Sequence, residues 1–161
     1  MKEIILKPIG IIHTPFKNPK GAPIQSARSN GAEGTIELNS EYVDGLKDLD
    51  GFSHIILIYY FHLSQGFELE VIPFLDIKKR GLFATRAPKR PNPIGLSTVE
   101  LLRIENNILH IKNVDMVDGT PLLDIKPYVP EFDSHTQIRT GWLKDKSGKS
   151  EKTKADDRFD D

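Results

Sequence analysis

The chain has 161 residues, with 38% hydrophobic and 28% charged side chains, and its formal net charge at pH 7 is −1. This length predicts one domain with a single core, and the charge excludes a protein that is basic over its whole surface, so any contact with nucleic acid must come from a local patch. The sequence contains no cysteine, which excludes disulfides, thiolate metal sites and a cysteine nucleophile.

The N-terminal residues predict a strand rather than a targeting segment. Residues 4–6 and 9–13 are apolar and form one strand that Pro8 interrupts. The segment lacks the long apolar core and the small-residue cleavage site of a signal peptide, and no later apolar run approaches the ~20 residues of a membrane span. We therefore expect a cytoplasmic protein with no membrane partner.

Loops and strands alternate in the next part of the chain. Residues 17–34 are rich in Pro, Gly, Lys and Ser and predict a long loop, and residues 35–38 alternate in polarity as a strand does. Residues 54–62 are nearly all β-branched or aromatic, which predicts a strand buried on both faces. Residues 71–75 predict a weaker strand, because Pro73 confines it to a sheet edge.

One helix is predicted between these strands. Ser40 is its candidate N-cap, and the Asp50-Gly51 pair marks its end. Four apolar residues at helical spacing share one face: Tyr42, Val43, Leu46 and Leu49. This spacing predicts an amphipathic helix.

The C-terminal part predicts a hairpin, one further strand and a tail. Residues 98–104 and 108–114 pair naturally across a short turn, and residues 122–128 predict another strand. From residue 144 to 161 the chain is charged with almost no apolar residue, which predicts a disordered or loosely docked tail. We therefore expect one β-barrel domain over residues 1–143, followed by this tail.

Six or more strands with one convincing helix predict the fold class. The chain is expected to be mainly β, as a small closed or partly open β-barrel with one or two short helices. No glycine fingerprint follows a strand and no phosphate-binding P-loop is present, so a Rossmann nucleotide site is not expected. The five histidines are far apart in sequence and form no metal-binding pair, so no metal site is expected.

The most informative segment is the proline-rich loop at residues 81–96. Three prolines lie within six residues, at positions 88, 91 and 93, and each fixes its own backbone and extends the residue before it. The stiff loop holds three cations in set directions: Arg86, Lys89 and Arg90. A pre-ordered cationic loop on a β scaffold indicates a site for an anionic ligand or an RNA backbone. A proline-rich surface turn with solvated charges is the alternative.

Two other places carry candidate functional residues. Asp115 and Asp118 follow a strand end, where carboxylates and backbone N–H groups suit an amine, a ribose hydroxyl or an adenine edge. Asp118 alternatively organises its own turn. His62 ends the long predicted strand, either at a barrel rim or as a hydrogen-bonded core histidine. Gln25, in the predicted loop near the N-terminus, is able to read a base or an amide.

Together these motifs resemble those of a known family. The proline loop with R-x-x-x-R-P-N-P-I-G, the later V-D-M-V-D-G-T-P-L-L-D-I-K-P-Y and the earlier G-F-S-H…F-H are similar to the motifs of the TrmO (TsaA-like, YaeB-like) family, and the resemblance runs from about residue 9 to 143. It implies a small β-barrel that acts as a homodimer and uses S-adenosylmethionine. It also implies methyl transfer to N6 of threonylcarbamoyladenosine at position 37, beside the anticodon of threonine tRNA.

The resemblance further implies which residues form the site. Carried over by motif, the cofactor-contacting residues are Pro23, Ile24, Gln25, Phe61, His62, Arg86, Leu96, Asp118, Gly119, Thr120 and Pro121. Lys89, Arg90 and Asn92 are expected to bind the substrate RNA. His62 or Asp118 is expected to accept the proton of the attacking nitrogen, directly or through water.

Two departures from the family pattern matter. Ile24 stands where family members typically have arginine, which removes one cation. The chain also resembles the short archaeal-type form, which lacks the C-terminal domain thought to help hold tRNA in bacterial members, so its tRNA contacts are expected from the barrel or a partner. Two other functions stay open: an S-adenosylmethionine-binding sensor or regulator, and a methyltransferase that acts on a small molecule.

Overall fold

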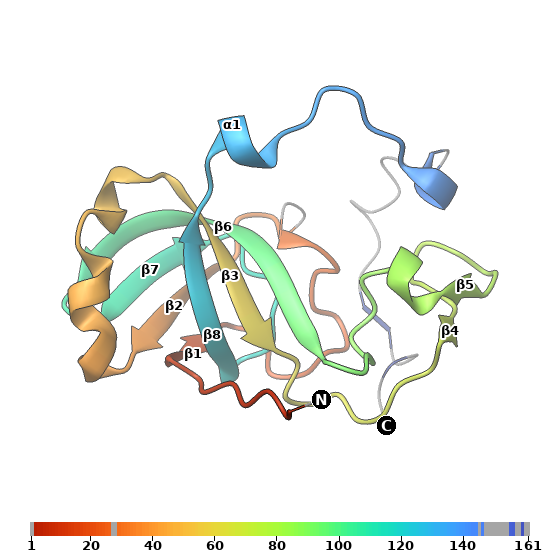
Figure 1. Ribbon diagram of the computed structural model, residues 1–161, viewed down its shortest axis with the longest axis horizontal. Coiled ribbons are helices and arrows are strands. Elements are labelled where there is room, and N and C mark those ends of the chain that lie inside the picture. Colours follow the sequence, from red (N-terminus) through yellow and green to blue (C-terminus); the bar gives the residue numbers. More distant parts are fainter. Residues whose placement is uncertain (1, 27–28, 145, 147–154, 157–158, 160–161) are drawn as a thin grey trace.

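Six strands close into an antiparallel barrel in this computed structural model, which describes residues 2–26, 29–144, 146, 155–156 and 159. The strand order around the barrel is β1-β2-β7-β6-β3-β8 (Figure 1). The strands are β1 (Gly10–His13), β2 (Glu33–Leu38), β3 (His54–Tyr60), β6 (Ile94–Glu105), β7 (Ile108–Lys112) and β8 (Thr120–Pro127). The mainly β barrel expected from the sequence is confirmed, and its antiparallel pairing differs from the parallel sheet of a Rossmann fold.

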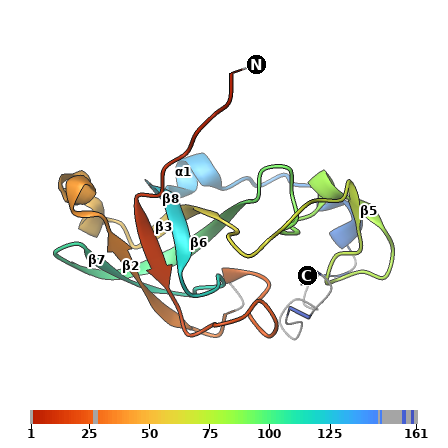
Figure 2. The ribbon, with the colours of Figure 1, turned by 90° about the horizontal axis from the view of Figure 1, so that it is seen from below.

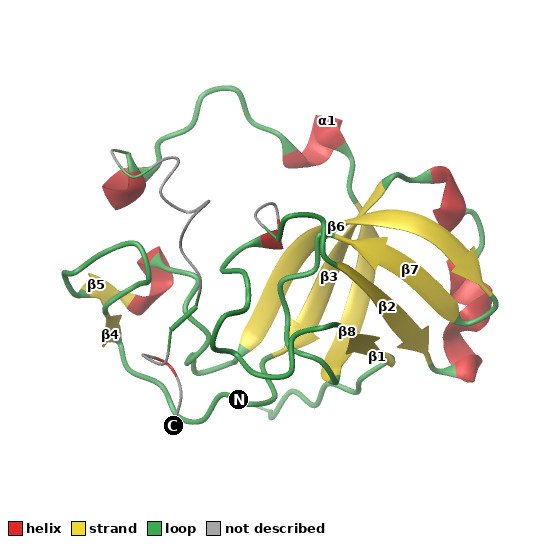
Figure 3. Cartoon of the chain, turned by 180° about the vertical axis from the view of Figure 1, so that it is seen from behind, coloured by secondary structure: helices red, strands yellow, loops and turns green. Residues whose placement is uncertain are grey.

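Short elements lie outside the barrel. A ladder of β4 (Glu70–Val71) and β5 (Arg80–Gly81) stands beside it (Figure 3). One short turn of α-helix, α1 (Pro130–Asp133), follows β8. The 3₁₀ helices are Ser40–Leu46, Leu49–Gly51, Leu82–Ala84 and Gly141–Leu143. Over the residues that the structure describes, no helix has the length and apolar character needed to cross a membrane.

The core is the inside of the barrel, because barrel strands alternate inward and outward side chains. In β3, Ile55, Leu57 and Tyr59 point inward and are at most 4% exposed. The same cluster contains Ile12, Ile36, Leu38, Val99, Leu101, Leu109, Ile111, Val114, Met116 and Leu122. A second, smaller cluster joins β4 to the proline loop and contains Val71, Leu82 and Ala87.

Replacing Ile36 by alanine is expected to cost about 2–5 kcal/mol of unfolding free energy, since this β2 residue is fully buried and its truncation leaves a cavity in a closed barrel. Ile77→Ala is the matched control. The Ile77 side chain is 89% exposed, and its loss should change stability by less than about 0.5 kcal/mol. Chemical denaturation measures both values, and equal losses in the two variants would contradict the assignment of the barrel interior as the core.

The first predicted strand is shorter than the sequence pattern indicates. Residues 4–6 are coil, and β1 begins at Gly10. Pro8 has no N–H to donate, and the backbone bonding of this segment starts at Ile9. The segment before β1 projects away from the barrel (Figure 2), and Ile4 is 86% exposed. The strand prediction for residues 4–6 is therefore wrong, because apolar residues without a ladder partner do not form a strand.

The predicted helix forms as two 3₁₀ segments. Ser40–Leu46 and Leu49–Gly51 are separated by Asp48, whose φ of 66° is left-handed. Asn39 rather than Ser40 precedes the first segment, and it makes no side-chain capping bond. The prediction of Ser40 as the N-cap is therefore wrong. The predicted apolar face is confirmed for Leu46 and Leu49, which pack against the barrel core.

Barrel geometry corrects three further strand predictions. β3 is not buried on both faces, because one face of a barrel strand points outward, and its outward residues are half-buried or exposed. β6 begins at Ile94 rather than at Thr98, so the proline loop runs directly into this strand. The strand predicted at residues 71–75 shrinks to Glu70–Val71 and ends before Pro73. The hairpin of β6 and β7 and the strand β8 are confirmed.

Most of the predicted tail at residues 144–161 lies outside the described residues. Two of its described side chains contact the rest of the protein. Lys146 Nζ lies 2.7 Å from Asp76 Oδ1, and the Phe159 ring meets the Phe74 ring edge to face at 5.1 Å between centroids. The prediction for the tail as a whole stays a prediction.

Candidate functional site

A cavity of about 860 Å³ opens between the barrel and the loops beside it. Its wall comes from distant parts of the chain: the coil between β1 and β2, the end of β3, the proline loop with the start of β6, the connection from β7 to β8, and the C-terminal residues 155–156 and 159. The volume lies in the range of small-molecule sites in proteins. Over the described part of the chain, no group of three or more histidine or acidic side chains is placed to hold a metal ion.

Most of the residues predicted to contact a cofactor meet at this cavity. Eight of the eleven line its wall: Pro23, Ile24, Gln25, Phe61, His62, Arg86, Leu96 and Thr120. Three are not part of the described wall: Asp118, Gly119 and Pro121. Of the residues predicted to bind RNA, Arg90 lines the cavity, whereas Lys89 and Asn92 are outside the wall that the structure describes.

Arg86 and Gln25 join two segments of the wall. Arg86 Nη1 donates a hydrogen bond to Gln25 Oε1 at 2.8 Å, although 61 positions separate the two residues in the sequence. The bond ties the proline loop to the coil between β1 and β2. Because a guanidinium carries five donors in a fixed fork, a single bond of this kind holds the Arg86 side chain at the cavity without using up its donors.

Gly95 makes room for the ring of Tyr59 in the cavity wall. The two residues are partners across β3 and β6. A Cβ at Gly95 would overlap Cε2 and Cζ of the Tyr59 ring, so the close approach of these strands requires glycine at this position. On another side the Tyr59 ring meets the ring of Phe61 edge to face, at 5.4 Å between centroids.

Tyr59, Ser97 and Asp115 form a hydrogen-bonded chain at the cavity wall. The Ser97 hydroxyl donates its one hydrogen to Asp115 Oδ1 at 2.7 Å. The Tyr59 hydroxyl lies 3.0 Å from Ser97 Oγ and must therefore be the donor in that bond. Tyr59 and Ser97 are 4% and 3% exposed, and Asp115 lines the cavity. The three residues come from β3, β6 and the connection from β7 to β8, so the barrel itself holds the carboxylate in place.

Burial raises the pKa of Asp115 to about 6, because desolvation disfavours the charged carboxylate. Desolvation outweighs the opposing effects of the Ser97 hydroxyl, of the backbone N–H groups of Asp115 and Ser26, and of the positive charge of Arg86. Burial also raises the pKa of Tyr59, and the nearby carboxylate adds to this effect, so the phenol stays protonated. A carboxyl group that titrates near neutral pH beside a cavity is typical of functional sites.

Asp115 is a site residue that the sequence motifs alone did not indicate. Asp115 and Asp118 both follow a strand and both lie in the motif V-D-M-V-D-G-T-P, but only Asp118 was expected to contact the cofactor. The register of β3 on β6, which brings Tyr59 and Ser97 to the carboxylate, is the signal that was missing.

His62 follows the end of β3 and lines the cavity in a half-buried position. Burial lowers the pKa of its imidazole, so the neutral form is favoured at neutral pH. Each neutral imidazole carries one nitrogen that donates and one that accepts. His62 therefore offers a second proton acceptor at this cavity.

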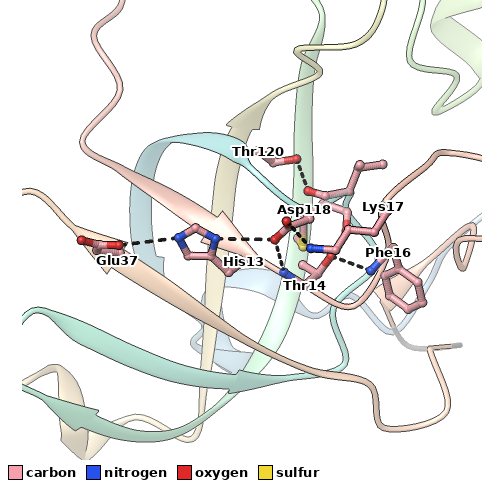
Figure 4. Close-up of polar contacts among 9 residues, drawn as sticks. His13, Thr14, Phe16, Lys17, Glu37, Asp118 and Thr120 are labelled. Carbon is pink, nitrogen blue, oxygen red and sulfur yellow. Dashed lines mark hydrogen bonds and ion pairs between the residues drawn. The ribbon is translucent and has the colours of Figure 1, made fainter.

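Asp118 lies outside the described cavity wall and fastens the start of β8 to the residues after β1 (Figure 4). Its Oδ1 accepts a hydrogen bond from the Thr14 backbone N–H at 3.0 Å, and its Oδ2 pairs with Lys17 Nζ at 2.6 Å. His13 Nδ1 lies 3.5 Å from Oδ1. The Lys17 bond is the main cause of the lowered pKa of Asp118, followed by the bond from Thr14.

Asp118→Asn is expected to remove the ion pair with Lys17 and to cost less than about 1 kcal/mol at neutral pH, because the pair lies at the surface. The folded state lowers the pKa of Asp118, so its contribution is present above the ordinary value of 3.8 and is lost as the pH falls through the lowered pKa. The difference in unfolding free energy between variant and wild type should therefore shrink in acid. Lys17→Met is expected to show the same pH dependence. A difference that stays constant down to pH ~2 would contradict this role.

Arg90 braces the proline loop from within. Its Nη1 donates to the backbone carbonyls of Thr85 at 3.1 Å and Ala87 at 3.3 Å, and its guanidinium lies over the Phe83 ring at 5.8 Å from the centroid. These contacts stabilise the loop that carries Arg86. The RNA contact expected of Arg90 stays a prediction beside this supporting role.

Described C-terminal residues cover part of the cavity. Ala155 exchanges backbone bonds with the coil between β1 and β2: Gly21 N–H donates to Ala155 O at 2.8 Å, and Ala155 N–H donates to Ala22 O at 3.1 Å. Phe159 packs against the cluster that joins β4 to the proline loop. Together with Asp156 these residues line the cavity.

Residues 11–134 match the family model for the tRNA-methyltransferase O N-terminal domain. A probable S-adenosyl-L-methionine-binding protein of Pyrococcus abyssi is 55% identical over 97% of this chain and 85% of its own length. The tRNA (adenine(37)-N6)-methyltransferase of Escherichia coli is 36% identical over 83% of this chain and 61% of its own length.

A solved structure agrees with these sequence matches. The crystal structure of TrmO from Pseudomonas aeruginosa has a TM-score of 0.74 and 36% sequence identity, and the match covers 88% of this chain and 63% of that one. The chain thus spans less than two thirds of these bacterial relatives and most of the Pyrococcus protein. Because the family model matches most of the chain, the chain belongs to the tRNA-methyltransferase O family, whose N-terminal domain it shares.

Proposed function

We propose that the chain binds S-adenosylmethionine in the cavity and transfers its methyl group to N6 of threonylcarbamoyladenosine at position 37 of tRNA, with threonine tRNA as the substrate. The observation that carries this proposal is the meeting of eight predicted cofactor residues from distant segments at one cavity. Relatives of the chain are named S-adenosyl-L-methionine-binding proteins and tRNA (adenine(37)-N6)-methyltransferases. A protein with this activity works on tRNA, so we place it in the cytoplasm.

The residues of the cavity fit this cofactor. S-adenosylmethionine, when bound, supplies a methyl group on a positively charged sulfur. Phe61, Leu96 and Ile24 provide apolar surface for its nucleoside, and the carboxylate of Asp115 provides a negative charge in the same wall. Methyl transfer is an in-line displacement, so the main task of the protein is to position two reactants. Strands β3 and β6 give the wall the rigidity that positioning requires.

Arg86 is proposed to hold the carboxylate of the threonyl group on the modified base. A guanidinium binds a carboxylate with two parallel hydrogen bonds, which fixes both distance and orientation. Arg86 is exposed at the edge of the cavity and is already oriented by Gln25. Lys78, Lys79 and Lys89 lie on or near the same loop and are proposed to contact tRNA phosphates, which position the substrate without reading its sequence.

We further propose that two copies of the chain associate through the outer face of the barrel. Ile11 on β1, Tyr60 on β3 and Leu96 on β6 are 45%, 41% and 53% exposed. Strands β3 and β6 are neighbours, β8 lies between β3 and β1, and Leu96 also lines the cavity. Where exposed apolar side chains adjoin, such a surface indicates an interaction site. Sedimentation equilibrium is expected to give twice the chain mass of 18.2 kDa. A single-chain mass at every protein concentration would contradict the dimer.

The proposed function is tested by transfer of a labelled methyl group from S-adenosylmethionine to tRNA taken from a strain that lacks this protein. Nucleoside mass spectrometry of the product is expected to show methylated threonylcarbamoyladenosine. Tight cofactor binding by calorimetry with no methyl transfer would contradict the enzyme, and transfer to a small molecule alone would replace tRNA as its substrate.

A sensor or regulator is the second candidate, favoured by one observation: relatives from Pyrococcus abyssi and Archaeoglobus fulgidus are named for S-adenosyl-L-methionine binding rather than for methyl transfer. The sensor predicts cofactor binding without affinity for RNA. The enzyme predicts that an anticodon stem-loop binds and that its affinity falls as salt rises, because cationic contacts to phosphates release counterions.

A further inference from the structure

The carboxylate of Asp115 is held at the cavity wall by a chain of buried partners. Ser97 Oγ donates to its Oδ1 at 2.7 Å, and the Tyr59 hydroxyl lies 3.0 Å from Ser97 Oγ. The Tyr59 ring is confined in turn by Gly95 and by the ring of Phe61. The position of the carboxylate is therefore fixed by side chains that the register of the barrel strands holds in place. A general base needs such a fixed position.

The two proton acceptors expected from the sequence are placed differently. Asp118 lies outside the described cavity wall, and its carboxylate is engaged by Thr14 and Lys17. His62 lines the cavity but follows the end of β3, beyond the paired part of the barrel. Asp115 combines a place in the wall with direct connection to the core.

We propose that Asp115 is the catalytic base of the methyl transfer, a role that rests on the proposed function. Its carboxylate takes the proton from the N6–H bond of the modified adenosine. The electron pair left on nitrogen forms the new N–C bond to the methyl group, while the C–S bond breaks and its electron pair stays on sulfur. The products are the methylated nucleoside, a neutral thioether and a protonated Asp115, which then returns its proton to solvent.

Charge balance favours this assignment. Before the step the site holds the negative carboxylate of Asp115 and the positive sulfur of the methyl donor, and after it both groups are neutral. Separated charges are costly in a desolvated cavity, so a step that removes both is favoured there. A base at the protein surface would gain nothing from this effect.

The environment of Asp115 also suits proton transfer near neutral pH. Burial raises its pKa to about 6, so the carboxylate is ionised at neutral pH and is a stronger base than an exposed aspartate. The charged and titratable side chains that share the cavity wall are Lys20, Tyr59, His62, Arg86, Arg90 and Asp156. The hydrogen bond from Ser97 lowers the pKa of Asp115, and of the wall residues just named Arg86 lowers it through its positive charge.

Asp115→Asn and His62→Gln compare the two acceptors at this cavity. Asparagine keeps an oxygen for the Ser97 hydroxyl but takes no proton. We expect Asp115→Asn to lower the rate of methyl transfer at saturating substrates by about 10²–10⁴-fold and to abolish the acidic limb of the pH–rate profile. His62→Gln should keep that limb. Ser97→Ala should move the limb to higher pH, because it removes a bond that stabilises the ionised carboxylate.

A readout without catalysis accompanies the kinetics. Unfolding of wild type and Asp115→Asn is compared across pH in the absence of ligands. Because the folded state raises the pKa of Asp115, its contribution to stability is present below the ordinary value of 3.8 and is lost as the pH rises through about 6. Asp115→Asn should therefore gain stability relative to wild type as the pH rises over this range. Calorimetry should show unchanged affinity of Asp115→Asn for the neutral product S-adenosylhomocysteine.

Three results would overturn the inference. The first is a transfer rate of Asp115→Asn equal to that of wild type. The second is loss of the acidic limb in His62→Gln but not in Asp115→Asn, which would assign the base to His62. The third is a wild-type protein that transfers no methyl group to any tRNA. That result would contradict the proposed function itself. It is distinguishable from a failure of the Asp115 inference alone, because it is seen with the wild-type protein before any variant is made.

Discussion

Replacing Gly95 by alanine is expected to weaken S-adenosylmethionine binding by at least about tenfold and to destabilise the fold by about 1–3 kcal/mol. The new methyl group would overlap the Tyr59 ring, which is 4% exposed and is confined on another side by Phe61. The ring must move, and its movement breaks the bond to Ser97 that holds Asp115 at the cavity wall. Calorimetry of cofactor binding and thermal unfolding measure the two effects.

Gly45→Ala is the matched control for this variant. Gly45 lies in an exposed 3₁₀ helix, where an added Cβ meets nothing within 4 Å. The change should leave cofactor binding as it is and alter stability by less than about 1 kcal/mol. Wild-type cofactor affinity in Gly95→Ala would show that the cofactor does not depend on the Tyr59 side of the cavity.

Arg86→Ala is expected to lower kcat/KM for tRNA methylation by about 10–100-fold, which corresponds to the loss of about 1.5–3 kcal/mol from one charged hydrogen-bonded contact. The variant removes the proposed clamp on the threonyl carboxylate and the bond to Gln25 Oε1 at 2.8 Å. The positive charge of Arg86 lowers the pKa of Asp115, so its removal should also move the acidic limb of the pH–rate profile to higher pH. Steady-state kinetics across pH measure both effects.

Arg103→Ala removes the same charge at a distance from the cavity. Arg103 is on β6 and pairs with Glu105 at 2.8 Å, and it does not line the cavity wall that the structure describes. Its kinetics should match those of the wild type. If Arg86→Ala methylates tRNA as well as Arg103→Ala does, the proposed carboxylate clamp is wrong.

The barrel and most of its strands are predictable from local sequence patterns. The β6–β7 hairpin follows from two alternating runs around a turn, and Asn106 at this turn has a φ of 57°, a conformation that asparagine tolerates better than most residues. The cavity residues are also accessible from the sequence, but only through motifs. Arg86 belongs to a motif that is specific as a pattern, whereas Pro23 and Gln25 stand in a short segment that is weak as a pattern. Their convergence on one cavity appears only in the fold.

The chain of Tyr59, Ser97 and Asp115 was beyond local sequence patterns. No local pattern singles out Tyr59 in β3, Ser97 in β6 or Asp115 after β7. The register that sets Gly95 opposite Tyr59 and the closure of the barrel bring them together. Such contacts depend on strand pairing over long sequence distances, which periodicity does not encode.

The positions of Asp118 and of residues 4–6 also depend on strand pairing that local sequence patterns do not encode. The position of Asp118 in a signature made it a cofactor candidate, but the pairing of β1 with β8 turns its carboxylate toward Thr14 and Lys17. Residues 4–6 have the composition of a strand, yet β1 pairs with its neighbours only from Gly10 onward. In both cases the position of the residues depends on which strand lies alongside, and the cofactor contact of Asp118 stays a prediction.

Methyl transfer to two anticodon stem-loops that differ only in the threonylcarbamoyl group at position 37 tests the central claim most directly. Each stem-loop is mixed with excess protein and labelled S-adenosylmethionine, and the single-turnover rate is measured together with nucleoside mass spectrometry of the product. We predict transfer to N6 of the modified stem-loop and none to the unmodified one. Equal transfer to both, or no transfer to either while the cofactor binds, would contradict the proposed function.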